Sequence, residues 1–197
     1  GAFFISTDGI TKGGLWNEEI SSAIFQAPEA VKQIEIRGKK FDLTSLESRV
    51  EARYQLTEYT KYLPLVDRKK ALKEISKQTN SPEMTHDFLT VEQIKEMHLA
   101  GMTIGAHTHS HPILLKEDND VAFEQIQQSK IILEEVIKAP VDYFAYPNGK
   151  YGQDFDQRHM DMIVKLGFKA ALSTDWGSVS NFEQDKYRIK RFPPWDG

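Results

Sequence analysis

The sequence has no cysteine, which excludes a disulfide framework and thiol chemistry. No apolar run approaches the roughly 18 residues of a membrane-spanning helix, and no basic start followed by an apolar stretch, the pattern of a secretory leader, is present. Basic residues are not in excess either: the net charge of -4 argues against nucleic acid as a partner.

Apolar and charged residues occur in ordinary amounts, 40% and 27% of 197 residues, so a packed globular core is expected. Thr90 to Gln93 forms a capping box and predicts a helix that ends at Gly101. Helical patterns then alternate with short apolar runs, which is typical of a parallel sheet covered by helices. The expected strands are 102–104, 141–146 and 168–172, and the helices between them are 118–139 and 157–166.

Three of the six histidines, His107, His109 and His111, follow directly after the first of these apolar runs. Neutral imidazole is the commonest protein ligand for zinc and similar ions, so this spacing indicates a metal site at a strand end. In a helix His107 and His111 would share a face, whereas in an extended chain all three would line one side. Pro112 disfavours a helix here, and a solvated loop rich in histidine is the alternative.

The segment His107-Thr108-His109-Ser110-His111 resembles the His-[Ser/Thr]-x-x-His motif of the polysaccharide deacetylases, also called the NodB-homology family. The blocks 144–149 and 172–176 are similar to the next two motifs of that family and follow in the same order. The resemblance implies an α/β fold, a distorted and incomplete (β/α) barrel. It also implies one deacetylase-like domain over residues 1–197, with a family-variable excursion at about 16–88.

A protein of this family is expected to be a metal-dependent hydrolase that removes N- or O-linked acetyl groups from an acetylated polysaccharide or oligosaccharide. The resemblance assigns the metal, zinc first and cobalt or nickel as alternatives, to His107 and His111. The backbone N–H of Asn148 maps to the oxyanion hole. Tyr146, Pro147 and Trp176 map to the substrate groove; packing in the core is the alternative for Tyr146 and Trp176, and for Trp176 the groove is favoured. The family favours the cell envelope or the extracellular space.

Two departures from the family pattern affect the expected activity. The run Ala2 to Ser6 resembles the second strand of the family, so we expect the first strand, with the Asp-Asp motif that supplies the catalytic base and a third metal ligand, to be missing and this chain to be nearly inactive alone. Thr7-Asp8-Gly9 is predicted to be a turn, with Asp8 as a fallback ligand. Ala145 replaces the arginine that usually orients the catalytic aspartate.

Two other functions stay open at this point. One is a glycan-binding relative that has no catalytic activity, and the other is an amide hydrolase that acts on a non-sugar substrate. The excursion carries no assigned chemistry. It is expected to contain a hairpin around Arg37-Gly38-Lys39 and a helix that starts near Thr44, on which Leu46, Val50 and Tyr54 recur at helical spacing. Its tyrosines, Tyr54, Tyr59 and Tyr62, are interpreted as core residues rather than as sugar contacts.

Overall fold

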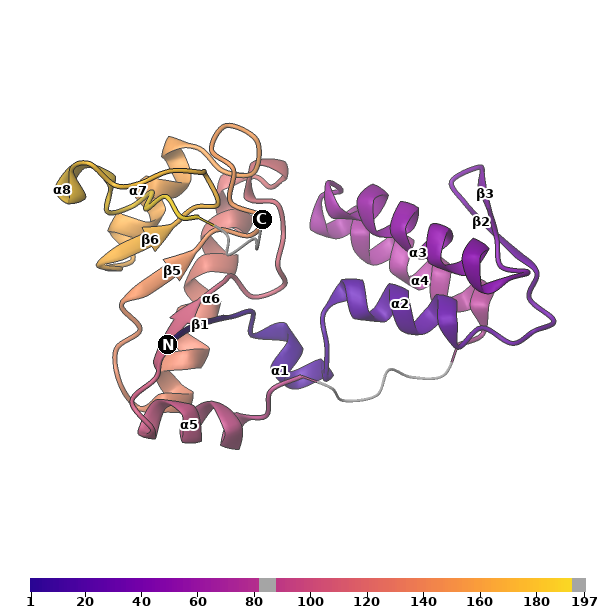
Figure 1. The fold of residues 1–197 in the computed structure, drawn as a ribbon, viewed down its shortest axis with the longest axis horizontal. Coiled ribbons are helices and arrows are strands. Elements are labelled where there is room, and N and C mark those ends of the chain that lie inside the picture. The colour runs from indigo at the N-terminus through magenta and orange to yellow at the C-terminus, as the bar shows by residue number, and fades with distance from the viewer. Residues whose placement is uncertain (82–87, 193–197) are drawn as a thin grey trace. The chain divides into compact units, whose positions relative to one another are not determined.

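The computed structural model describes residues 1–81 and 88–192 and divides the chain into two compact units (Figure 1). The sheet unit comprises residues 1–10 and 89–197, and the helical unit comprises residues 11–88. The helical unit includes the excursion expected at about 16–88, and the single-domain organisation stays a prediction. Within the described ranges, no helix combines the length and the apolar character needed to cross a bilayer.

The sheet unit is built on four parallel strands in the order β1-β4-β5-β6. Their bounds are Ala2–Ile5 for β1, Thr103–Ala106 for β4, Tyr143–Ala145 for β5 and Ala170–Leu172 for β6. Among the described residues the sheet stays open and does not close into a barrel. The α/β prediction with an incomplete barrel is therefore confirmed. Because all four strands run the same way, the loops that follow them lie along one edge of the sheet, which we call the rim.

Helices α5 (Val91–Leu99) and α6 (Asn119–Ile137) pack against β4 and against each other, and α6 also contacts α7 (Gln157–Lys165) (Figure 1). The capping box predicted for α5 is confirmed, since the Thr90 hydroxyl accepts from the Gln93 N–H at 3.2 Å and the Gln93 side chain accepts from the Thr90 N–H at 2.9 Å. The remaining short helices are α1 (Asp8–Lys12), η1 (Leu114–Lys116) and α8 (Phe182–Asp185).

The chain after β1 does not form the simple turn predicted for residues 7–9. The Ile10 N–H donates to the Thr7 carbonyl at 3.2 Å, and α1 begins at Asp8. Aspartate is favourable in the first turn of a helix as well as in turns, and the sequence alone did not separate the two. Asp8 thus lies beyond the carboxyl end of β1, at the rim.

The helical unit packs α2 (Trp16–Phe25), α3 (Leu46–Lys61) and α4 (Leu65–Thr79) with a hairpin of β2 (Gln33–Ile36) and β3 (Lys39–Asp42). The hairpin prediction is confirmed. Arg37 and Gly38 have φ values of 50° and 80°, the left-handed pair that a two-residue hairpin turn requires. The core of this unit is apolar and includes Ile20, Ile24, Ile34, Leu43, Leu56 and Ile75.

Helix α3 turns several of its large apolar side chains to solvent. Leu46 is 67% exposed, and Val50, Tyr54 and Tyr59 are also exposed, while the helix buries Ala52, Leu56 and Thr60. The interpretation of Tyr54 and Tyr59 as core residues is therefore wrong. Small and medium side chains on the opposite face let α3 lie close to its neighbours, and periodicity did not reveal which face would be covered.

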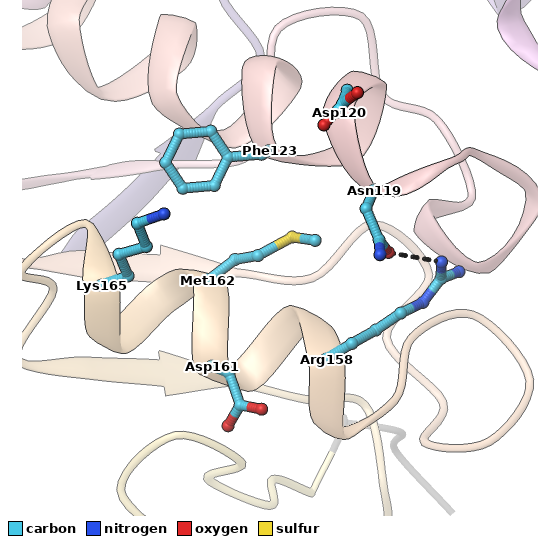
Figure 2. A pocket seen from close by; sticks show the side chains of 7 residues that line it. All are labelled: Asn119, Asp120, Phe123, Arg158, Asp161, Met162 and Lys165. Atoms are coloured by element: carbon cyan, nitrogen blue, oxygen red, sulfur yellow. Dashed lines mark hydrogen bonds between the residues drawn. The ribbon is translucent and has the colours of Figure 1, made fainter.

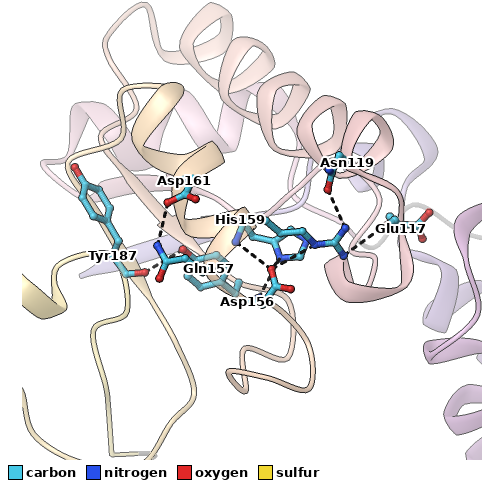
Figure 3. A network of polar contacts seen from close by, with 9 residues as sticks. Glu117, Asn119, Asp156, Gln157, His159, Asp161 and Tyr187 are labelled. Atoms are coloured by element: carbon cyan, nitrogen blue, oxygen red, sulfur yellow. Dashed lines mark hydrogen bonds and ion pairs between the residues drawn. The ribbon is translucent and has the colours of Figure 1, made fainter.

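A polar network joins the starts of α6 and α7 (Figure 3). The Arg158 guanidinium donates to the Asn119 side chain at 2.9 Å and contacts the Asp156 carboxylate at 3.3 Å. His159 is fully buried, and its Nδ1 accepts from the Asp156 N–H at 3.0 Å. Burial, together with the charge of Arg158, lowers the pKa of His159.

The loop after β5 places Asn148 and Gly149 in the left-handed region, with φ values of 55° and 79°. The Gly149 N–H donates to the Pro147 carbonyl at 2.6 Å, and the Gly149 carbonyl accepts from the Thr174 N–H at 2.8 Å. A Cβ at position 149 would lie 2.9 Å from the Tyr146 carbonyl oxygen and 3.0 Å from the Thr174 nitrogen. Because backbone atoms lie this close on both sides, only glycine fits at position 149.

We predict that Gly149→Ala destabilises the protein more than Gly152→Ala. Gly152 has a similar φ of 78°, but a Cβ added there would meet no atom within 4 Å. The control should cost about 1–2 kcal/mol for the left-handed backbone, and Gly149→Ala should cost at least about 1 kcal/mol more because backbone atoms must move. Urea unfolding measures both, and equal losses would contradict the close approach.

We also predict that His159→Asn weakens the dependence of stability on pH. Because burial lowers the pKa in the folded state, the unfolded chain binds more protons below the ordinary value of about 6.5, and stability falls as the pH falls through that value. The free energy of unfolding at pH 7 and pH 5.5 should differ less in the variant than in the parent, while His98→Asn on α5 should keep the parent's difference. An unchanged pH dependence in His159→Asn would contradict this account.

Candidate functional site

His107 and His111 lie together in the loop that follows β4. Their ring centroids are 4.8 Å apart and the rings meet edge to face at 73°. The His107 Nδ1 is 2.6 Å from the Ala145 carbonyl oxygen at the end of β5, so Nδ1 carries the proton and Nε2 is the nitrogen left to coordinate. Both rings are half-buried. The loop thus brings together the two histidines that the sequence assigned to a metal.

Thr108, between them, is fully buried and holds the loop in shape. Its hydroxyl donates to the His107 carbonyl at 2.5 Å and accepts from the His111 N–H at 3.1 Å. Thr108 and His111 both have positive φ, 64° and 52°. Two left-handed residues within four positions bend the chain sharply, and the hydroxyl offsets that strain by linking the two histidine backbones.

His109 is directed elsewhere. Its Nδ1 is 2.8 Å from the Thr7 hydroxyl and its Nε2 is 3.5 Å from the Asp8 carboxylate. Backbone bonds continue the pairing of β1 with β4 at this point, since the Asp8 N–H donates to the His109 carbonyl at 2.9 Å. His109 and Asp8 therefore connect the start of α1 to the histidine loop.

The electrostatics of the His107 environment suit a metal ligand. The pKa of His107 is lowered to about 4, mainly by burial and to a smaller extent by the charge of Arg191, against the opposing effect of the Ala145 carbonyl. A neutral imidazole with one nitrogen tied to a carbonyl is the usual state of a histidine that binds zinc. A centroid separation of 4.8 Å is compatible with two imidazoles that share one ion. Within the described residues, no group of three or more His, Cys, Asp or Glu side chains is arranged to hold one.

Asn148 lies on the neighbouring loop of the rim, half-buried. Its carbonyl accepts from the Thr174 hydroxyl at the end of β6. Across residues 1–81 and 88–192, its backbone N–H donates to no protein acceptor. The Asn148 peptide is therefore held in place, its N–H is unused, and it lies three residues after the carbonyl that contacts His107. These are the properties expected of an oxyanion-hole donor.

Tyr146 and Pro147 are both buried. The Tyr146 ring stacks on Phe155 with centroids 3.6 Å apart and an angle of 5°, and its hydroxyl donates to the Tyr187 carbonyl at 3.0 Å. Burial raises the pKa of Tyr146 well above its ordinary value. These contacts favour packing, the second of the two roles considered for Tyr146, and they fix the loop that carries Asn148.

Trp176 is 65% exposed and packs edge to face against Phe192, with centroids 5.0 Å apart. Just before it, the Asp175 carboxylate accepts from Arg188 Nε at 2.7 Å, and the Arg188 guanidinium lies 4.0 Å from the centre of the Tyr151 ring. This cluster was not predicted. Arg188 lies thirteen positions after Asp175, a spacing with no local signature, and only the pairing of Ile189 with Leu172 brings them together.

A separate pocket of about 540 Å³ lies between the start of α6 and α7 (Figure 2). It is lined by Asn119, Asp120, Phe123, Arg158, Asp161, Met162 and Lys165. Two acidic and two basic side chains balance one another there, and none of the predicted site residues contributes to its wall. The chemistry of the histidine loop therefore belongs to the rim and not to this pocket.

Comparison with protein families finds one model, Polysaccharide deacetylase, that matches residues 20–171. No curated protein sequence matches the chain. Among solved structures, the chain is similar to the Streptococcus pyogenes deacetylase PplD in complex with acetate, at 23% identity and a TM-score of 0.49 over 64% of this chain and 58% of that one.

The chain is also similar to a polysaccharide deacetylase from Bacillus cereus, at 27% identity and a TM-score of 0.45 over 52% of this chain and 31% of that one. It further resembles IcaB from Ammonifex degensii, at 21% identity and a TM-score of 0.41 over 54% of each. The chain thus spans between about a third and three fifths of the length of these proteins. Since the family model covers most of the sequence, including the histidine loop and the loop of Asn148, the chain belongs to the polysaccharide deacetylase family.

Proposed function

We propose that this chain forms part of a metal-dependent hydrolase that removes acetyl groups, N- or O-linked, from a polysaccharide or oligosaccharide. His107 and His111 hold a divalent metal, zinc in the first place. The bond of 2.6 Å between His107 Nδ1 and the Ala145 carbonyl carries this proposal, because it orients one imidazole as a ligand and couples it to the loop of Asn148.

When bound, a divalent ion of this kind polarises a carbonyl and makes hydroxide available near neutral pH. The chain's own residues supply the frame for the reaction. Water adds to the acetyl carbon, the bond from that carbon to the sugar nitrogen or oxygen breaks, and the leaving group takes a proton. The Asn148 N–H donates to the oxyanion that forms on the acetyl oxygen, and the Thr174 hydroxyl keeps that peptide in place through the Asn148 carbonyl.

Trp176 is proposed to contact the sugar. Its ring is largely exposed at the rim, and Phe192 supports it from the side. A flat indole face suits the apolar face of a sugar ring. Pro147 is proposed to shape the groove through the backbone that it fixes. Tyr146 is proposed to act indirectly, through the packing of the same loop.

Zinc binding tests the ligand assignment. We expect zinc to bind the chain, and His107→Ala or His111→Ala to weaken the binding by at least about tenfold, since even the loss of an outer partner of a metal ligand has an effect of this size. His98→Ala, on α5 and outside the loop, is the control and should leave the titration unchanged. Calorimetry with the metal alone measures all four proteins. Equal affinity in both loop variants and the parent would refute the assignment.

Sugar binding tests the groove. We expect Trp176→Ala to weaken the binding of an N-acetylated chitooligosaccharide several-fold, because a stacked aromatic ring contributes roughly 0.5–1.5 kcal/mol. Phe182→Ala removes another exposed aromatic ring, on α8, and should have little effect. Fluorescence titration reports the affinity. If both variants bind like the parent, the groove does not include Trp176.

Turnover separates the proposed reaction from the two alternatives. We expect release of acetate from the acetylated oligosaccharide to require a carboxylate that takes the proton of the attacking water. Robust deacetylation by this chain would show that Asp8 or another of its carboxylates serves as that base. Preferred cleavage of a formamide or cyclic imide would instead favour an amide hydrolase with a non-sugar substrate.

A further inference from the structure

The segment after α8 runs alongside β6 as an additional strand-like edge. The Ile189 N–H donates to the Ala171 carbonyl and the Ser173 N–H to the Ile189 carbonyl, at 2.8 Å and 2.9 Å, and Leu172 pairs with Ile189 in parallel. The Arg191 N–H then donates to the Asp175 carbonyl at 3.1 Å. Arg191 is thereby fixed at the carboxyl end of β6, on the same rim as the histidine loop.

Side chains in an extended segment alternate between its two faces. On one face, Arg188 pairs with Asp175 at 2.7 Å, and Lys190 lies near Gly177, where an added Cβ would meet Lys190 Cδ at 3.3 Å. Arg191 belongs to the opposite face. The two neighbouring cations, Arg188 and Lys190, are thus directed away from the face that carries Arg191.

Arg191 has an exposed side chain and forms no ion pair with any described residue. Arg188, by contrast, is paired with a carboxylate and covered by the Tyr151 ring. An unpaired guanidinium on a backbone held by β6, at the same rim as the histidine loop, is suited to bind an anion.

We propose that Arg191 is the carboxylate-binding residue of this site. A guanidinium offers a planar pair of N–H donors that matches the two oxygens of a carboxylate, and of the two arginines at this edge, Arg188 is committed to Asp175 whereas Arg191 has its donors uncommitted among the described residues. Two sources of a carboxylate fit this chemistry, namely the acetate released by hydrolysis and a uronic acid carried by the glycan. The inference rests on the proposed deacetylase function and names a ligand group within that site.

Acetate binding tests the inference without turnover. We expect the affinity of the chain for acetate, measured by NMR titration, to fall about tenfold in Arg191→Ala, the effect of losing one charge-assisted hydrogen bond. Lys190→Ala removes an adjacent cation from the opposite face and should stay within about twofold of the parent. Acetamide, a neutral molecule of the same shape, should bind alike to the parent and both variants.

Further measurements separate the effect of charge from that of geometry and identify the source of the carboxylate. Arg191→Lys keeps the charge but loses the planar pair of donors, so we expect an intermediate loss, and circular dichroism should confirm that each variant is folded. A parallel titration with glucuronate identifies the source: tighter binding than acetate, lost in Arg191→Ala, indicates a carboxylate on the glycan. Equal losses in Arg191→Ala and Lys190→Ala, or no loss in either, would overturn the proposal.

Zinc titration of Arg191→Ala separates this inference from the proposed function. If zinc binds but acetate binding is independent of Arg191, the inference fails while the metal assignment stands. If zinc binds neither the parent nor the variant, the metal assignment fails, and the acetate titration of the metal-free chain still decides the role of Arg191.

Discussion

The hydrogen bond between His107 and the Ala145 carbonyl is the contact on which the arrangement of the site depends. It crosses from the loop of β4 to the end of β5, and it can form because parallel strands place both carboxyl ends at one edge. Thr174 extends the connection to the end of β6 through Asn148 and Gly149. Three short strands are thus joined at the rim by their loops as well as by their sheet bonds.

Backbone conformations that are unfavourable in isolation occur at these joins. Thr108, His111, Asn148 and Gly149 all have positive φ. Each is compensated locally: the Thr108 hydroxyl links the two histidines, and Thr174 holds the loop of Asn148. Such strained positions collect where a scaffold must direct particular groups toward a ligand, and their presence on two adjacent loops fits a site assembled by the sheet.

Much of this architecture could be predicted from the sequence because the relevant signals are local. The capping box of Thr90, the hairpin at Arg37-Gly38 and the spacing of His107 and His111 each involve residues within five positions of one another. The ion pair of Asp175 with Arg188 and the burial of Tyr146 depend on pairing between distant segments, which no local pattern encodes. The exposed face of α3 was missed for a related reason: periodicity shows that a helix has two faces but not which one its neighbours cover.

The hydroxyl of Tyr146 links two segments of the rim that are far apart in the sequence. By donating to the Tyr187 carbonyl, it ties the base of the loop that carries Asn148 to the segment that carries Arg191. Those two parts of the rim are therefore braced by a stiff aromatic ring whose other face is held against Phe155. Under the proposed function, a glycan would therefore meet two rim segments that are already ordered, so that little ordering entropy remains to be lost when it binds.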